Sequence, residues 1–256
     1  MITSTQNPKL KLARSLMGRP KERHDAKAFV AEGVRLVEEA LAAGWPMQFI
    51  LYTPGLGERG RELVKKLEAK RLVVEQVSDT LMNSITETEN SQGILAVLDY
   101  PLFSIPQSLN FALIPDSIRD PGNLGTLLRT AAAAGVQAVF LPPETTDVFA
   151  PKVVRAGMGA HFRLPTHTLT WEEIRKVTKS LKVYLADMEG SPCWQTDFRL
   201  PLALIVGGEA EGATEEARKL ADLSVSIPMP GKAESLNAGV AGAILMFEVV
   251  RQRKLQ

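Results

Sequence analysis

The pattern of apolar and polar positions divides the chain into two halves of different texture. In the first half, segments with helical spacing alternate with short apolar runs, which predicts helices and strands in turn. The predicted helices cover residues 7–16, 30–43, 58–70 and 80–84, and the predicted strands cover 49–52, 72–77 and 93–98. This mixed α/β pattern fills residues 1–98, which is long enough for an independent domain.

In the second half, short and continuously apolar runs are separated by helical segments. The predicted strands cover residues 111–114, 138–141, 183–186, 202–206 and 224–227, and the predicted helices cover 123–134, 150–158, 171–180, 214–221 and 236–252. Such strands are typical of a parallel sheet with helices on both faces. Residues 99–109, with Pro101 and Pro106 and few charges, read as a linker. The sequence therefore predicts an α/β protein with domains at 1–98 and 110–256.

Composition narrows the possible classes of protein. The chain has 256 residues, a formal net charge of +1, one cysteine and three histidines. These counts exclude a disulfide framework, and the histidines (His24, His161 and His167) lack metal-ligand spacing, so we expect no metal and interpret them as surface or RNA-facing residues. No apolar run reaches 18 residues and the N-terminus lacks a secretory signal, so we expect a soluble cytoplasmic protein without a membrane partner.

Near-neutral net charge conceals a basic segment at the N-terminus. Residues 1–27 contain seven lysines and arginines but only two acidic residues, a density typical of contacts with nucleic-acid phosphates. A solvated helix face is the alternative. The candidate RNA-binding residues are Lys9, Lys11, Arg14, Arg19 and Arg23, with Arg155 in the second half.

The first of three unusual loops follows the strand predicted at 111–114. Ligands in open parallel sheets bind beyond the carboxyl ends of strands, where loops lead into helices. Here Pro121 and Gly122 predict a turn, Asn123 is placed to cap the next helix, and Arg129 points away from the apolar alanine face. The alternative is a capped helix with one exposed arginine.

The second loop, GGEAEGA at 207–213, is rich in glycine, which lets the backbone approach a ligand closely. Its spacing matches neither the dinucleotide fingerprint nor the phosphate loop. Glu209 and Glu211 would repel a pyrophosphate, which favours a neutral or cationic ligand. The alternative is an acidic turn that suits the following helix dipole.

The third loop, PMPGKAESLNAG at 228–239, precedes the last predicted helix. Ser235 or Asn237 is placed to cap that helix, and Leu236 offers an apolar wall. Gly239 and Gly242 are costly inside a helix, by about 1 kcal/mol each relative to alanine, so they predict tight packing against a neighbour.

Taken together, the motifs N-L-G-T-L-L-R-T-A, I-V-G-G-E-A-E-G and I-P-M-P-G-K-A-E-S-L-N-A-G-V-A resemble the SpoU (TrmH) class of the SPOUT RNA methyltransferases, over most of residues 110–252. The segments S-T-Q-N-P-K-L-K and F-V-A-E-G-V-R-L-V-E-E-A-L are similar to the RNA-binding domain of the ribosomal-RNA branch, itself similar to small α/β ribosomal proteins. The resemblance implies transfer of a methyl group from S-adenosyl-L-methionine to a ribose 2′-hydroxyl, a homodimer, and a C-terminal trefoil knot, although chains rarely thread.

The resemblance also implies roles for individual residues. The methyl donor would be held by Gly207, Ile227, Met229 and Leu236, and the catalytic positions would be Asn123, Arg129, Glu209, Ser235 and Asn237. The chain departs from the family at Gly208 and Ala210, since the second loop more often reads Gly-Asn-Glu-Gly.

The resemblance gives the hydroxyl-activating role to Arg129. Because a guanidinium stays protonated, our hypothesis is that Arg129 acts by electrostatics, holding the adjacent phosphate and stabilising the oxyanion. The leading interpretation is a 2′-O-methyltransferase of 23S-type ribosomal RNA. The alternatives are a transfer-RNA 2′-O-methyltransferase and a catalytically silent RNA-binding assembly factor.

Overall fold

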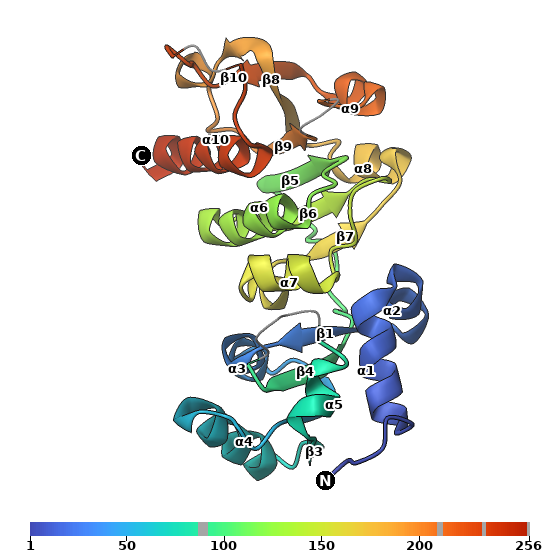
Figure 1. Ribbon diagram of the computed structural model, residues 1–256. Helices are drawn as coiled ribbons and strands as arrows, with labels where there is room; N and C mark the ends of the chain where they lie inside the picture. The colour runs from blue at the N-terminus through green and yellow to red at the C-terminus, as the bar shows by residue number, and fades with distance from the viewer. Residues whose placement is uncertain (87–91, 209–211, 232–233, 255–256) are drawn as a thin grey trace. The chain divides into compact units, whose positions relative to one another are not determined.

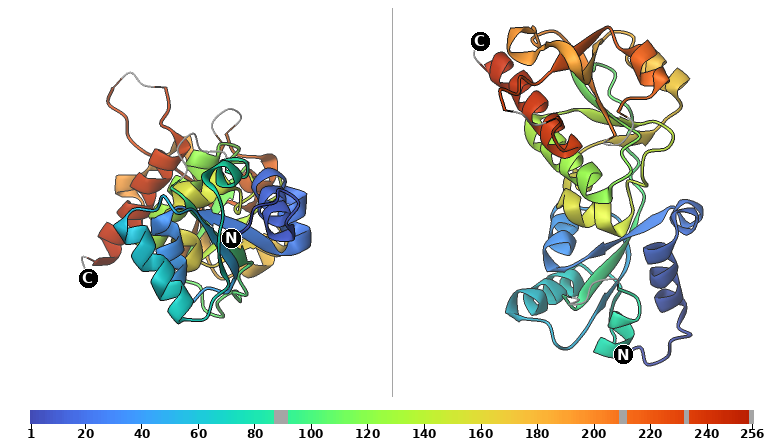
Figure 2. Two further views of the ribbon diagram at one scale, coloured as in Figure 1. Left: turned by 60° about the horizontal axis from the view of Figure 1, so that its bottom comes forward. Right: turned by 45° about the horizontal axis from the view of Figure 1, so that its top comes forward.

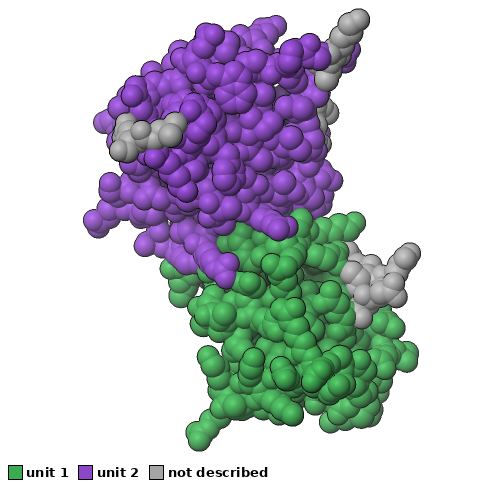
Figure 3. Space-filling model, turned by 90° about the vertical axis from the view of Figure 1, so that its left-hand side faces the viewer, with its two compact units in different colours: residues 1–102, 147–162 green, residues 103–146, 163–256 purple. Residues whose placement is uncertain are grey.

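The structure is a computed structural model that describes residues 1–86, 92–208, 212–231 and 234–254. The chain forms two compact units (Figure 3). Unit 1 comprises residues 1–102 and 147–162, and unit 2 comprises 103–146 and 163–256. The domain limits 1–98 and 110–256 stay a prediction from sequence. In the compact units, the segment 147–162 belongs with the N-terminal half.

Unit 1 is built on a four-stranded mixed sheet with the order β1-β4-β2-β3 (Figure 1). β4 is antiparallel to β1 and β2, and β3 is parallel to β2. The strands are β1 (Ala28–Glu32), β2 (Met47–Tyr52), β3 (Val74–Gln76) and β4 (Ile94–Asp99), and the first five helices are α1 (Pro8–Gly18), α2 (Pro20–Ala26), α3 (Val34–Ala42), α4 (Glu58–Ala69) and α5 (Asp79–Asn83). Helix α1 begins where Asn7 accepts a hydrogen bond from the Lys9 amide, and its buried face includes Leu10 and Leu16.

The helix predicted over 30–43 is wrong in its first part. Residues 28–32 form β1, and the helix begins only at Val34. Residues 28–31 of β1 are all buried and form a continuous apolar run. The periodicity of such a run cannot tell a buried strand from a buried helix. Gly33 separates the two elements with φ of 103°, a conformation that favours glycine. The sequence analysis also missed the short helix α2.

The segment 147–162 completes the core of unit 1. Helix α7 (Pro151–Gly157) packs against β1, followed by a 3-10 helix at Ala160–Phe162. The Phe149 ring lies 4.3 Å from the Tyr100 ring and 4.8 Å from the Phe29 ring, centroid to centroid. Arg23 lies on α2, and its guanidinium donates a hydrogen bond to Asp147 Oδ2 at 2.6 Å. Aromatic contacts and a partly buried ion pair therefore tie this segment to β1 and α2.

His161 belongs to the same buried segment, so its interpretation as a surface or RNA-facing residue is wrong. It is 2% exposed, and its Nε2 lies 2.8 Å from the Val148 carbonyl oxygen. Burial lowers the pKa of His161 from its ordinary value of 6.5 to about 4.

This shift predicts a loss of stability in acid. Because the unfolded chain binds a proton at His161 that the folded chain excludes, stability falls as the pH drops from about 6.5 toward 4. We expect the free energy of unfolding of His161→Gln, measured by urea denaturation, to fall less over this range than that of the wild type. The matched control is His24→Gln, whose side chain is 85% exposed and which should keep the wild-type slope. Equal slopes for all three proteins would contradict the assignment.

Unit 2 contains the predicted parallel sheet, in the order β10-β8-β9-β5-β6-β7 with every paired neighbour parallel. The strands are β5 (Phe111–Asp116), β6 (Ala138–Leu141), β7 (Thr166–Thr168), β8 (Lys182–Pro192), β9 (Leu202–Gly207) and β10 (Leu223–Ser226). The helices are α6 (Pro121–Ala134), α8 (Trp171–Val177), α9 (Glu215–Leu220) and α10 (Ala238–Lys254), with a 3-10 helix at Cys193–Gln195. β7 has only three residues and was not predicted.

Helices cover both faces of this sheet. Ile174 of α8 and Ala217 of α9 share a hydrophobic cluster with Ala112 and Ile114 of β5. On the other face, α6 and α10 lie side by side (Figure 2). A Cβ added at Gly242 would lie 2.3 Å from Leu127 Cδ2 of α6, which confirms the predicted tight packing at this glycine.

The register between β8 and β10 changes at the carboxyl edge of the sheet. Ser224 pairs with Leu185, but the next residue, Val225, pairs with Ser191. Residues 186–190 therefore leave the ladder between these two pairs. A Cβ at Gly190 would lie 2.4 Å from the Val225 backbone nitrogen, so only glycine fits where the backbones approach.

The described residues contain neither a helix able to span a membrane nor a metal-binding cluster. No helix there has the length and apolar character to cross a membrane. No group of three histidine, cysteine or acidic side chains in that part of the chain is placed to hold a metal ion.

Candidate active site

A cavity of about 700 Å³ opens in unit 2 at the carboxyl edge of the sheet. All four residues predicted to hold a cofactor line it, and so do two of the predicted catalytic residues. These six are Gly207, Ile227, Met229, Leu236, Ser235 and Asn237. Val206, Val225 and Leu245 add apolar wall. A mostly apolar cavity with a few polar groups suits a medium-sized organic ligand that has both apolar and polar parts.

A buried carboxylate that was not predicted from the sequence holds Thr214, the residue that follows the second loop. Asp116, at the end of β5, is fully buried, and its Oδ2 accepts a hydrogen bond from the Thr214 amide at 2.7 Å. Burial raises the pKa of this carboxyl group, and the hydrogen bond from Thr214 opposes that shift. One feature of the sequence could have indicated this role: Asp116 is an acidic residue at the end of an apolar strand, directly before a turn.

Close backbone contacts explain the two glycines at the start of the second loop. A Cβ at Gly207 would lie 2.7 Å from the Ala213 backbone nitrogen, and one at Gly208 would lie 2.5 Å from the Ser117 carbonyl oxygen. An asparagine at 208, which the family more often has, would require Ser117 to shift. Glycine at position 208 therefore fits the close approach of the Ser117 backbone. Glu209, with Ala210, lies outside the described residues, so its catalytic role stays a prediction.

Asn237 joins the third loop to the first. Its Oδ1 accepts a hydrogen bond from the Val240 amide at 3.2 Å and caps α10, as predicted. Its Nδ2 donates to Asn123 Oδ1 at 2.9 Å. The predicted cap of α6 by Asn123 is wrong, because Asp120 accepts the hydrogen bond from the Asn123 amide at 2.8 Å. The side chain of Asn123 instead connects two loops.

Arg129 stands on α6 outside the cavity lining. The apolar face of α6, which includes Leu124 and Leu128, is buried, whereas Arg129 is exposed. Arg129 forms no ion pair with any residue in the described ranges. An exposed guanidinium at this position is available to an anionic group such as an RNA phosphate.

An ion pair not predicted from the sequence lines another part of the cavity. Arg218 Nη1 of α9 donates to Asp187 Oδ2 at 2.6 Å, and the Glu189 amide donates to Asp187 Oδ1 at 3.0 Å. The Glu189 amide and, after it, the Arg218 guanidinium hold the pKa of Asp187 below its ordinary value. Asp187 is therefore ionised at neutral pH.

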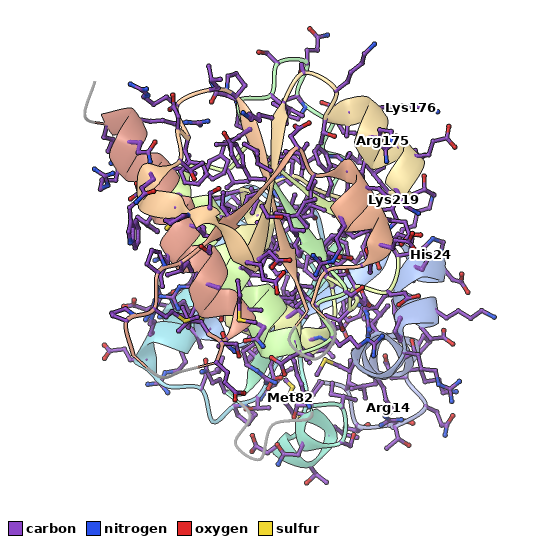
Figure 4. All side chains as sticks on the ribbon, turned by 90° about the horizontal axis from the view of Figure 1, so that it is seen from above. Arg14, His24, Met82, Arg175, Lys176 and Lys219 are labelled. Carbon is purple, nitrogen blue, oxygen red and sulfur yellow. The ribbon has the colours of Figure 1, made fainter. Side chains whose placement is uncertain are left out.

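The predicted RNA-binding residues fall into two groups. Lys11, Arg14 and Arg19 are exposed, and Figure 4 labels Arg14 on α1. The other three, Lys9, Arg23 and Arg155, have acidic partners.

Each of these partners limits what the basic residue can contact. Lys9 is paired with Glu75. Arg155 Nη1 lies 3.6 Å from Glu32 Oε2. Arg23 is 2% exposed and donates to the Leu16 carbonyl oxygen as well as to Asp147, so we remove it from the predicted RNA contacts.

Comparison with known proteins places the chain among RNA methylases. Residues 110–247 match the SpoU rRNA Methylase family, and residues 7–96 match the MRM3-like substrate binding domain. The chain is 35% identical to the 23S rRNA (guanosine(2553)-2′-O)-methyltransferase RlmP of Bacillus subtilis, over 97% of this chain and 98% of that one. It is 32% identical to the 23S rRNA (uridine(2479)-2′-O)-methyltransferase of Streptomyces viridochromogenes, over 98% and 92%.

A solved structure agrees along almost the whole chain. The SpoU methyltransferase AviRb from Streptomyces viridochromogenes, in complex with the cofactor AdoMet, superposes with a TM-score of 0.84 at 30% identity, covering 98% of this chain and all of that one. With a family model matching more than half of its length and relatives of this similarity, the chain belongs to the SpoU rRNA methylase family.

Proposed function

We propose that this protein transfers the methyl group of S-adenosyl-L-methionine to a ribose 2′-hydroxyl of 23S ribosomal RNA. The observation that carries the proposal is the cavity, which gathers residues of the second and third loops and is joined through Asn237 to Asn123 of the first. Family membership and the names of two full-length relatives support the same reaction and the same class of RNA.

The residues present fit the methyl donor. The backbone at Gly207 lies close to that of Ala213, so no side chain fills the cavity at this position. Ile227, Met229 and Leu236 supply apolar surface for an adenine ring. When bound, S-adenosylmethionine supplies an electrophilic methyl group for in-line displacement. Because that displacement needs little covalent help, positioning by the three loops accounts for most of the catalysis.

Arg129 acts on the RNA rather than on the donor. Its exposed guanidinium holds the phosphate beside the target ribose and stabilises negative charge on the 2′-oxygen as its proton leaves. Asn123 and Asn237 join the first and third loops, and Ser235 lines the cavity. Glu209 has the role of an organiser rather than of the base. The hydroxyl proton leaves to solvent or to a neighbouring oxygen.

Recognition of RNA is divided between the two halves. In unit 1, Lys11, Arg14 and Arg19 supply phosphate contacts, which position an RNA without reading its sequence. The match of residues 7–96 to a substrate binding domain favours ribosomal RNA over transfer RNA. The intact Asn123–Asn237 link and the accessible Arg129 argue against a silent assembly factor.

The test is ribose-methylation mapping of ribosomal RNA from a strain that lacks this gene and from the complemented strain. We expect one 2′-O-methyl group in 23S RNA to disappear and to return on complementation. Loss of a transfer-RNA methyl group instead would favour the alternative substrate. An unchanged methylation pattern in both RNAs, with a growth or assembly defect, would favour the silent RNA-binding protein.

The finer structural proposals concern assembly, topology and location. We propose a homodimer that buries the exposed apolar side of α10, where Val240 is 46% exposed and Phe247 is 48% exposed. The trefoil knot is proposed from the fold family. The cytoplasm is proposed as the location, supported by the bacterial ribosomal-RNA relatives.

Phe247→Glu tests the dimer. A charge on this apolar side is costly to bury, so we expect the variant to sediment as a monomer and to remain folded, because the Phe247 side chain contributes little to the core. Val73→Glu, at a position of unit 1 that is 47% exposed, is the control and should keep the wild-type mass. If Phe247→Glu sediments like the wild type, α10 is not the interface.

A further inference from the structure

We propose that Asp187 binds the ribose hydroxyls of the methyl donor, and that Arg218 holds Asp187 in position to do so. The inference rests on the proposed cofactor site. It adds a binding residue and a positioning residue that lie outside the three family motifs. Both side chains line the cavity.

The order of the strands orients the ligand. Asp187 follows the parallel part of β8, in the segment 186–190 that leaves the ladder, whereas Asn123 and Arg129 stand on the helix that follows β5. β9 lies between β8 and β5 in the sheet. Because the methyl group must leave toward Arg129 and the RNA, the nucleoside part of the donor lies at the β8 side, beside Asp187.

Asp187 has hydrogen-bonding capacity left for a diol. An ionised carboxylate offers about four acceptor positions. The Glu189 amide and the Arg218 guanidinium occupy one position on each oxygen. Two acceptor positions remain on a side chain that is 16% exposed. Two adjacent ribose hydroxyls supply two donors, and other nucleotide-binding folds place an acidic residue on the ribose in the same way.

The ion pair with Arg218 also determines which part of the methyl donor Asp187 binds. A lone carboxylate would attract the sulfonium or the α-ammonium group, but Arg218 neutralises this one. A neutralised carboxylate still accepts hydrogen bonds, which suits uncharged hydroxyls. Arg218 also lies against the second loop, since a Cβ at Gly212 would be 3.9 Å from its Nη2. Arg218 thus lies near the loop that begins at Gly207 as well as pairing with Asp187.

The experiment is calorimetric titration of the full chain with S-adenosylhomocysteine and with 5′-deoxy-5′-methylthioadenosine, which keeps the ribose but lacks the amino-acid part. We expect Asp187→Asn to weaken both ligands by about tenfold or more. Removing the 2′- or 3′-hydroxyl from S-adenosylhomocysteine should weaken binding to the wild type but cause much less loss in Asp187→Asn. Glu216→Gln, which removes an exposed negative charge of α9 two residues from Arg218, should leave affinity unchanged.

Arg218 is tested through its dependence on Asp187. Arg218→Met should weaken methylthioadenosine, and the double variant should bind it no more weakly than Asp187→Asn alone. Additive losses would show that Arg218 does not act through Asp187. Thermal unfolding of each variant identifies any affinity loss that comes from loss of fold.

Four results would overturn the inference. If Asp187→Asn weakens S-adenosylhomocysteine but not methylthioadenosine, Asp187 contacts the amino-acid part. If the deoxy analogues lose as much affinity in Asp187→Asn as in the wild type, Asp187 does not contact the diol. If the wild type binds neither ligand, the proposed cofactor site itself fails, whereas normal wild-type binding with an unchanged Asp187→Asn variant overturns only this inference.

Discussion

Arg129→Ala should lower kcat for ribose methylation by about 10²–10³-fold and leave the affinity for S-adenosylmethionine within about twofold. The separation follows from the position of Arg129, which is exposed on α6 and absent from the cavity lining. The loss reflects stabilisation of charge on the 2′-oxygen and contact with the adjacent phosphate. Single-turnover methylation of a 23S fragment and calorimetry with the donor measure the two quantities.

Arg129→Lys separates two forms of this hypothesis. A lysine keeps the positive charge but cannot bind a phosphate through two parallel N–H groups. We expect most of the activity to be lost in this variant as well. Near-normal turnover would exclude the bidentate contact, and a large loss of donor affinity in Arg129→Ala would place Arg129 in the cofactor site instead.

Phe149→Ala should cost about 3–5 kcal/mol of unfolding free energy, because it removes a large ring from the aromatic core of unit 1. The ring is 8% exposed and contacts Tyr100 and Phe29. Guanidinium denaturation followed by circular dichroism measures the cost, and hydrogen exchange of β1 amides shows that unit 1 is affected.

Trp194→Ala is the control for this prediction. Trp194 is a comparably large aromatic residue, but it is 51% exposed, so its removal should cost less than about 1 kcal/mol. Equal costs for the two variants would show that residues 147–162 do not belong to the core of unit 1.

Most strands and the cavity-lining loops of unit 2 could be predicted because the local apolar pattern there matches the burial of each segment in the folded sheet. The continuous apolar strands predicted a parallel sheet, and the loops at its carboxyl edge held the residues that line the cavity. Asp116 and the Asp187–Arg218 pair were missed because their roles depend on contacts across 98 and 31 residues. No local spacing encodes such contacts.

The errors of prediction in unit 1 have a similar cause. β1 was read as part of a helix because an apolar run fits either element until its neighbours are known. Arg23 looked like one more surface cation in a basic segment, yet its partner, Asp147, is 124 residues away. In unit 2, the cap of α6 was misplaced by three residues because both Asp120 and Asn123 have the right chemistry.

The placement of residues 147–162 has a consequence for how the protein is made. Unit 1 takes its first segment from residues 1–102 and its last from 147–162, with a stretch of unit 2 between them. During synthesis, β1 and its aromatic partners therefore leave the ribosome well before Phe149 and Phe162 exist to cover them. The N-terminal half cannot complete its core until residue 162 has emerged. Cutting the chain in the predicted linker would therefore leave unit 1 without residues 147–162 and would leave that segment on the piece that contains unit 2.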